Sequence, residues 1–120
     1  MDEVSIKRIY EPASSEDGRR VLVDRLWPRG VSKARAHLDA WLKEVAPSTE
    51  LRQWFGHRPE RWTEFRRRYI AELKDNPALP QLRDMIADAP VTLLYGARDA
   101  AHNEAVVLAE YLARPRAGGR

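Results

Sequence analysis

Two short runs of strand-forming residues, Val21-Leu22-Val23 and Val91-Thr92-Leu93-Leu94-Tyr95, constrain the fold of this 120-residue chain more than any other feature of its sequence. Each run is mostly apolar and is bounded by charged residues, glycine or proline, which is typical of a strand buried on both faces of a parallel sheet. Parallel strands need long crossover connections, and the stretch between the runs carries helical patterns. The sequence therefore predicts an α/β domain in which these runs are adjacent, parallel and nearly inaccessible to solvent.

The helical patterns are set by apolar spacing and by capping residues. Four residues after Pro59 recur at spacings of three and four, which predicts an amphipathic helix with one face in the core; they are Trp62, Phe65, Tyr69 and Leu73. Other local signals predict a first strand over 4–10, helices capped by Ser32, Ser48 and Asp99, a helix end at Gly56 and a helix from Pro80 to about Ala87. Residues 38–45 fit either a strand or a helix. Together these elements predict a single three-layer α/β domain over residues 1–113, with a small, mainly parallel sheet flanked by helices.

The positive charge of the chain is concentrated in one segment. Lys and Arg outnumber Asp and Glu by 21 to 18, and all three surplus arginines fall in residues 114–120, which we expect to form a basic, flexible tail. The one dense basic run, Arg66-Arg67-Arg68, lies at helical spacing from Glu64 and Glu72, so ion pairs on a solvated helix face account for it. Nucleic-acid binding through the run and the tail is the least favoured hypothesis, and a steep loss of binding with added salt would be its signature.

Several reaction classes are excluded by missing residues. The chain has no cysteine, which rules out disulfides, thiolate catalysis and cysteine-ligated metal centres. Its three histidines lack paired ligand spacing, and there is no Walker loop, dinucleotide fingerprint or nucleophile elbow, so we expect no metal and no cofactor. The acidic start and the lack of roughly 18 consecutive apolar residues predict a cytoplasmic protein without a membrane partner. The oligomeric state is not encoded in any of these patterns.

Polar residues gather directly after the two predicted strands. Because the carboxyl ends of adjacent parallel strands meet at one edge of the sheet, we expect these residues to line a ligand site. Three of them, Arg25, Arg29 and Arg98, are predicted to converge on an anionic group, since the planar guanidinium fork donates two hydrogen bonds to a carboxylate or phosphate. The predicted ligand-binding residues are Asp24, Arg25, Arg29, Gly96, Arg98 and Asn103, and the predicted catalytic residues are Tyr95, Asp99 and His102.

Most of these residues also have a structural interpretation. Asp24 and Arg25 fit an ion pair at a strand end, and Gly96 fits a turn as well as a close approach of phosphate to the backbone. Asp99 fits a helix cap as well as a proton carrier. His102, in what we predict to be the first turn of a helix, fits a neutral general base or a plain surface residue. A cluster of aromatic residues over 54–69 is assigned to the core, with His57 placed to reach a pocket.

Two function classes remain open on these residues. In the first, the protein is a hydrolase or transferase in which His102 or Asp99 moves protons and Tyr95 orients the substrate. In the second, the same pocket binds an anionic small molecule, phosphorylated or carboxylated, without turnover, as a ligand-binding or regulatory module. Stabilisation of the folded protein by sulfate or phosphate would support an anion site in either class.

Four segments of the chain resemble one bacterial family. They are Val21–Gly30, Trp54–His57, Phe65–Tyr69 and Thr92–Asp99. In their order and length these segments are similar to the YeaO-like family, known as domain of unknown function 488, and the likeness covers about residues 4–113. The family is uncharacterised, so the resemblance implies no particular reaction. Longer relatives carry a cysteine at the strand end where this chain has Tyr95-Gly96, and thiol chemistry is therefore not carried over.

Overall fold

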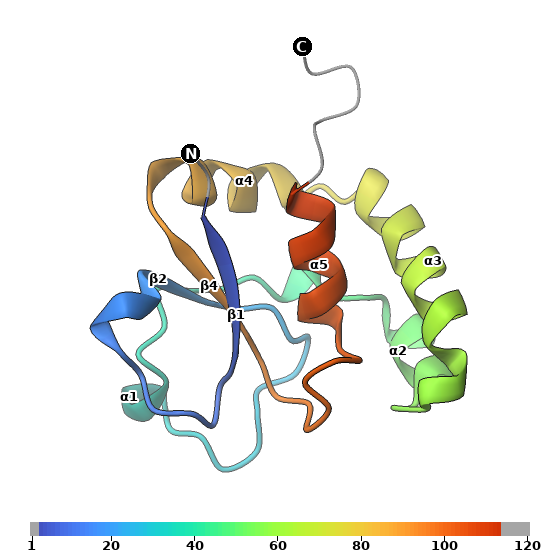
Figure 1. The fold of residues 1–120 in the computed structure, drawn as a ribbon, viewed down its shortest axis with the longest axis horizontal. Helices are drawn as coiled ribbons and strands as arrows, with labels where there is room; N and C mark the ends of the chain where they lie inside the picture. Colours follow the sequence, from blue (N-terminus) through green and yellow to red (C-terminus); the bar gives the residue numbers. More distant parts are fainter. Residues whose placement is uncertain (1–2, 114–120) are drawn as a thin grey trace.

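The computed structural model describes residues 3–113 and places four parallel strands in one sheet. The strands are β1 (Val4–Arg8), β2 (Arg19–Leu22), β3 (Ala40–Trp41) and β4 (Val91–Tyr95), in the spatial order β1-β4-β2-β3 (Figure 1). The helices are α1 (Lys33–Ala36), α2 (Thr49–Phe55), α3 (Trp62–Lys74), α4 (Leu79–Asp88) and α5 (Glu104–Ala113). The predicted single α/β domain with a small parallel sheet is confirmed. The predicted tail, 114–120, lies outside the described residues.

The two runs that predicted the sheet form its interior strands. β2 pairs with β4 in parallel, with Val21 opposite Leu93 and Leu22 opposite Leu94. All four of these side chains are fully inaccessible to solvent. The prediction of adjacent, buried parallel strands is therefore confirmed, and the carboxyl ends of both strands lie at the same edge of the sheet.

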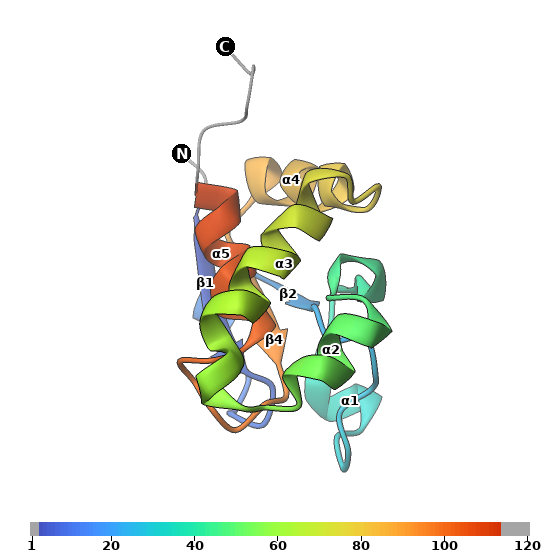
Figure 2. The same ribbon diagram turned by 90° about the vertical axis from the view of Figure 1, so that its right-hand side faces the viewer.

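Alternation along β2 and β4 divides the apolar residues between two faces of the sheet. Val21, Leu93 and Tyr95 belong to the larger core, which the helices α2 to α5 complete. Leu22 and Leu94 point the opposite way, into a smaller cluster that is closed by α1 and its flanking loops. Figure 2 shows α3 and α5 packed together over one side of the sheet, with α1 apart from them. The sheet is thus covered on both faces, heavily on one and thinly on the other.

Local capping signals set several helix ends. The Ser32 side chain accepts a hydrogen bond from Arg35 N at the start of α1, and that of Ser48 accepts one from Leu51 N at the start of α2. Gly56 ends α2 in the left-handed conformation, with φ of 53°. A 3₁₀ turn beginning at Pro59 leads directly into α3. The ambiguous segment 38–45 resolves into strand β3 followed by a 3₁₀ turn at Lys43–Val45.

The expected cap of the last helix is wrong. α5 begins at Glu104, and the side chain that caps it belongs to Asn103, whose Oδ1 accepts a hydrogen bond from Val106 N at 3.1 Å. Asp99 lies four residues earlier and closes a turn instead, because its Oδ1 accepts from Ala101 N at 2.9 Å and His102 N at 3.0 Å. The carboxylate therefore shapes the loop that leads from β4 to α5.

The chain also makes a close backbone approach before β2. Gly18 has φ of +64°, and a Cβ atom there would clash with the carbonyl oxygen of Pro90, directly before β4. Beside it, burial opposes ionisation of the Asp17 carboxylate, but hydrogen bonds from Ser14 N, Lys7 and Arg20 outweigh it and lower the pKa of Asp17. Within residues 3–113, none of the helices has the length and apolar character needed to cross a bilayer.

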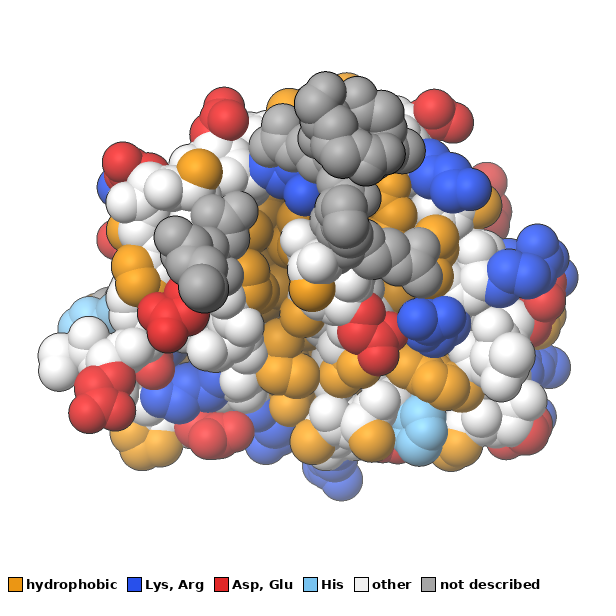
Figure 3. Space-filling model, turned by 45° about the horizontal axis from the view of Figure 1, so that its top comes forward, with side chains coloured by type: hydrophobic (Ala, Val, Ile, Leu, Met, Phe, Trp, Pro, Cys, Tyr) orange, Lys and Arg blue, Asp and Glu red, His pale blue; other side chains and the backbone are white. Residues whose placement is uncertain are grey.

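The basic run on α3 is neutralised by neighbouring carboxylates. Arg67 and Arg68 both donate to Glu64, and Arg66 donates to Glu110 of α5. The two arginines lower the pKa of Glu64 to about 2. On the face shown in Figure 3, basic side chains of the described residues are scattered among acidic and apolar ones instead of forming one patch.

Candidate functional site

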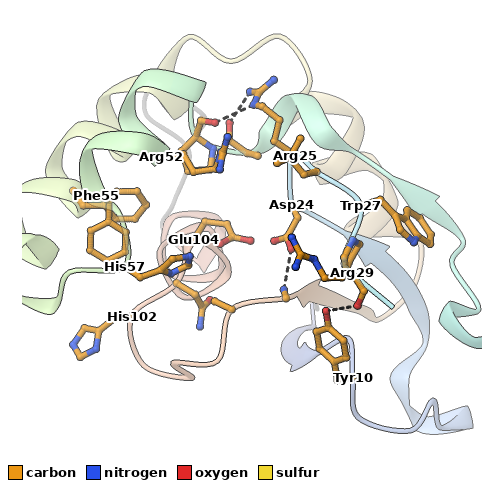
Figure 4. A pocket seen from close by; sticks show the side chains of 18 residues that line it. Tyr10, Asp24, Arg25, Trp27, Arg29, Arg52, Phe55, His57, His102 and Glu104 are labelled. Carbon is orange, nitrogen blue, oxygen red and sulfur yellow. Dashed lines mark hydrogen bonds between the residues drawn. The ribbon is translucent and has the colours of Figure 1, made fainter. Parts of the chain in front are cut away.

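A pocket of about 280 Å³ opens at the carboxyl ends of β2 and β4, where the sequence predicted a site. Its walls come from the segment after β2, the loop after β4, the start of α5 and the α2 region (Figure 4). Six of the nine predicted site residues line it: Asp24, Arg25, Arg29, Gly96, His102 and Asn103. Helix α2 and the turn that follows it add Arg52 and His57, and α5 adds Glu104.

Asp24 joins the two strand ends across the pocket floor. Its Oδ2 accepts a hydrogen bond from Gly96 N at 2.9 Å. A Cβ atom on residue 96 would lie 3.0 Å from the same oxygen, so glycine allows this close approach. Gly96 is not among the residues with positive φ in the described chain, and the expected turn geometry is therefore not the reason for a glycine here. The backbone N–H that the sequence offered to a phosphate is already occupied by Asp24.

Arg25 is held by backbone carbonyl groups of the pocket wall. Its Nε donates to Pro47 O at 3.1 Å, and its Nη2 donates to Ala46 O at 3.2 Å. No ion pair between Asp24 and Arg25 is present among the described residues, so the proposed structural pair is not formed. Arg25 instead fixes the Ala46–Pro47 segment while its side chain still lines the pocket.

Two guanidinium groups of the pocket have no protein partner. Within residues 3–113, the side chains of Arg29 and Arg52 form no hydrogen bond and no ion pair. Both residues are exposed, and both line the pocket. The Tyr10 hydroxyl donates to the backbone carbonyl of Arg29 at 2.7 Å, which holds the loop that carries this arginine. The donors of both side chains are therefore available to a ligand.

Glu104 brings a second carboxyl group to Asp24. The two side chains point toward one another in Figure 4. Burial, together with this neighbouring carboxyl, raises the pKa of Glu104 well above its usual value. The Oε2 atom of Glu104 is buried and has no hydrogen-bond partner among the described residues. The raised pKa favours the protonated form of Glu104 over the ionised form.

The remaining predicted residues occupy three different settings. His102 and Asp99 form a pair at the pocket rim, with Nδ1 and Oδ2 2.8 Å apart, and the hydrogen bond to His102 is the main cause of the lowered pKa of Asp99. Arg98 is exposed and is not among the lining residues, whereas Arg25 and Arg29 both line the pocket, so the three arginines expected to converge do not all reach it. Tyr95 is 3% exposed and packs in the larger core, and burial raises its pKa.

Within residues 3–113, no group of three or more His, Asp or Glu side chains is arranged to hold a metal ion. The chemistry that the pocket offers is therefore hydrogen bonding from guanidinium groups, a carboxyl pair and two histidines.

Comparison with known proteins identifies the family. Residues 3–117 match the family model described as the inactive DUF488-N3 subclade. The chain belongs to the YeaO-like DUF488 family. It is 46% identical to the uncharacterised protein YeaO of Escherichia coli over 110 residues, covering 91% of this chain and 96% of that protein. It is also 46% identical to the uncharacterised protein Rv3073c of Mycobacterium tuberculosis over 109 residues, covering 91% and 92% of the two chains. No solved structure gives a significant match.

Two lining residues of the pocket in this DUF488 chain, Arg52 and Glu104, were not among the site residues predicted from the sequence. Glu104 stands at the start of a helix, where an acidic residue is ordinary because it complements the helix dipole, so nothing local marked it. Arg52 lies on α2, whose contact with the strand ends no local pattern predicts. The inward direction of Tyr95 was available from the sequence, because Tyr95 shares the two-residue period of Val91 and Leu93.

Proposed function

We propose that this DUF488 protein binds an anionic small molecule, phosphorylated or carboxylated, in the strand-end pocket and does not turn it over. The observation that carries the proposal is the pair of partnerless guanidinium groups, Arg29 and Arg52, in one pocket. Together with Arg25, these two side chains place three positive charges in one pocket, which is unfavourable unless negative charge offsets them. Asp24 supplies one negative charge. The surplus positive charge selects an oxyanion that both guanidinium groups can contact.

The absence of turnover is supported from two sides. The matching family model is described as an inactive subclade, which favours a binding module over a hydrolase or transferase. Tyr95, the residue expected to orient a substrate, is buried in the core. The rim pair of His102 and Asp99 remains the feature that an enzyme would use, because a carboxylate that orients an imidazole is a common general-base arrangement.

The test is the melting temperature in increasing phosphate at constant ionic strength. An anion bound at 100 times its Kd adds about 2.7 kcal/mol to the stability of the folded state. For a domain of this size we expect a rise of about 10 °C. Arg29→Ala and Arg52→Ala should each reduce this rise, whereas Arg98→Ala, outside the pocket, serves as the matched control.

Two outcomes would redirect the proposal. An equal rise in all three variants would place the anion elsewhere, and a binding signal that collapses steeply with added salt would favour a polyanion. Release of nitrophenol from nitrophenyl phosphate or nitrophenyl acetate above the buffer rate, abolished by His102→Ala, would establish a hydrolase instead.

A further inference from the structure

The carboxyl pair of Asp24 and Glu104 has no role in plain anion binding, although it lies beside three arginines. Building on the anion pocket proposed above, we propose that this pair is a proton site, so that the pocket binds its oxyanion together with one proton. Anion affinity is then set by pH as well as by ligand concentration. The pair thereby makes the pocket a proton-coupled anion sensor.

The geometry assigns the proton to Glu104. Asp24 Oδ2 accepts a hydrogen bond from Gly96 N at 2.9 Å, so this carboxyl already has a donor. Glu104 has no comparable donor, and its buried Oε2 is without a partner in residues 3–113. A buried, partnerless oxygen is tolerated far better in a neutral carboxylic acid than in a carboxylate. Two carboxylates that face each other also repel, and the charge of Asp24 contributes to the raised pKa of Glu104.

The surroundings of Glu104 decide the sign of the coupling. The segment after β2 presents Asp24, Arg25 and Arg29, and the α2 region presents Arg52 and His57. The other ionisable groups close to the pair are Tyr69 from α3 and Tyr95 at the end of β4, and His102, before α5, lines the same pocket. Loss of the Glu104 proton places a second negative charge among these arginines, where it competes with the ligand for them.

Linkage then fixes the direction of the effect. Because a bound anion opposes ionisation of Glu104, anion binding holds the proton, and the proton in turn strengthens anion binding. Affinity should therefore fall as pH rises through ionisation of the pair, by up to about tenfold per pH unit for one coupled proton. Protonation of His57 and His102 would act in the same direction, so the experiment must separate the two contributions.

Sulfate is the probe, because it keeps its charge from about pH 5 to about pH 8.5, a range that includes the one in which imidazole side chains ordinarily change charge. Calorimetric titration of the wild type in two buffers of different ionisation enthalpy counts the protons taken up with each sulfate. We expect net proton uptake and an affinity that falls with pH. Glu104→Gln, which is neutral at every pH, should bind sulfate as the wild type does at low pH and should lose most of the pH dependence.

Matched variants separate the contribution of Glu104 from those of its neighbours. Glu110→Gln removes an exposed carboxyl from the same helix and should keep the wild-type pH profile. The double variant His57→Gln/His102→Gln should keep the part of the profile that Glu104 supplies. Asp24→Asn, which breaks the pair from its other side, is the second test if Glu104→Gln does not fold.

The outcomes distinguish the two proposals. If sulfate binds the wild type at no pH, the anion pocket itself is refuted. If sulfate binds but the wild type takes up no proton, or Glu104→Gln keeps the full pH slope, or the double histidine variant is flat, the proton coupling is refuted while the anion pocket stands.

Discussion

Removing one hydroxyl from the core tests how the pocket wall is held in place. Tyr69 and Val45 are both fully inaccessible to solvent, and the Tyr69 hydroxyl donates to the Val45 carbonyl oxygen. Tyr69→Phe keeps the ring packing and leaves this carbonyl group buried without its donor. An unsatisfied buried acceptor costs about 1 to 3 kcal/mol. At about 4 °C per kcal/mol for a domain of this size, the melting temperature should fall by about 4 to 12 °C.

The assay is urea unfolding followed by the tryptophan signal, with Tyr10→Phe as the matched control. The Tyr10 hydroxyl also donates to a backbone carbonyl, that of Arg29, but in an exposed position where water can replace it, so its loss should change stability by less than about 0.5 kcal/mol. Because Val45 directly precedes the carbonyl groups that hold Arg25, Tyr69→Phe should also reduce the rise in melting temperature caused by phosphate. A Tyr69→Phe loss no greater than that of Tyr10→Phe, at an unchanged denaturant slope, would refute this account.

Three further predictions follow from single contacts. Gly18→Ala and Gly30→Ala both place a side chain at positive φ, but only position 18 meets a neighbouring carbonyl group. Measured by urea unfolding, Gly30→Ala should lower the free energy of unfolding by about 1 to 2 kcal/mol, and Gly18→Ala should lower it clearly more. Equal losses in the two variants would contradict the clash. The pKa of Asp99, read by NMR titration, should lie below 3.8 and should move back towards it in His102→Ala, whereas an unchanged value would remove His102 as the cause. The pKa of Glu104 is raised above 4.5, so the unfolded state loses this proton at a lower pH than the folded state does. The free energy of unfolding of the wild type should therefore fall as pH rises from about 4.5, and Glu104→Gln should lack this fall. The same pH dependence of stability in both proteins would contradict the raised pKa.

The positions of most helices and strands could be predicted from the sequence because the forces that set them are local. Ser32, Ser48 and Gly56 act on backbone groups within one helical turn, so a short window of sequence contains both partners. The apolar runs of β2 and β4 predicted their own burial in the same way. The prediction for the cap of α5 was wrong because Asp99 and Asn103 are both residue types that cap helices. In the structure Asp99 closes the turn before the helix, and Asn103 caps the helix itself.

The location of the site could be predicted from the sequence, whereas the contacts of its side chains could not. The rule that adjacent parallel strands end at one edge located the pocket and brought Asp24 to Gly96. It did not predict that Arg25 would satisfy two backbone carbonyl groups, or that Arg98 would stay outside the pocket. A guanidinium group goes to whichever acceptors the folded backbone leaves open, and those acceptors lie on segments distant in the sequence.

Composition and periodicity thus determined a parallel α/β domain, its two interior strands and an arginine-bearing edge. Only the tertiary structure placed Glu104 against Asp24 and added Arg52 from α2 to the same pocket. The physical reason is the range of the interactions: capping and amphipathic spacing act within a few residues, whereas the charge, burial and protonation of a carboxyl pair depend on which distant elements pack around it.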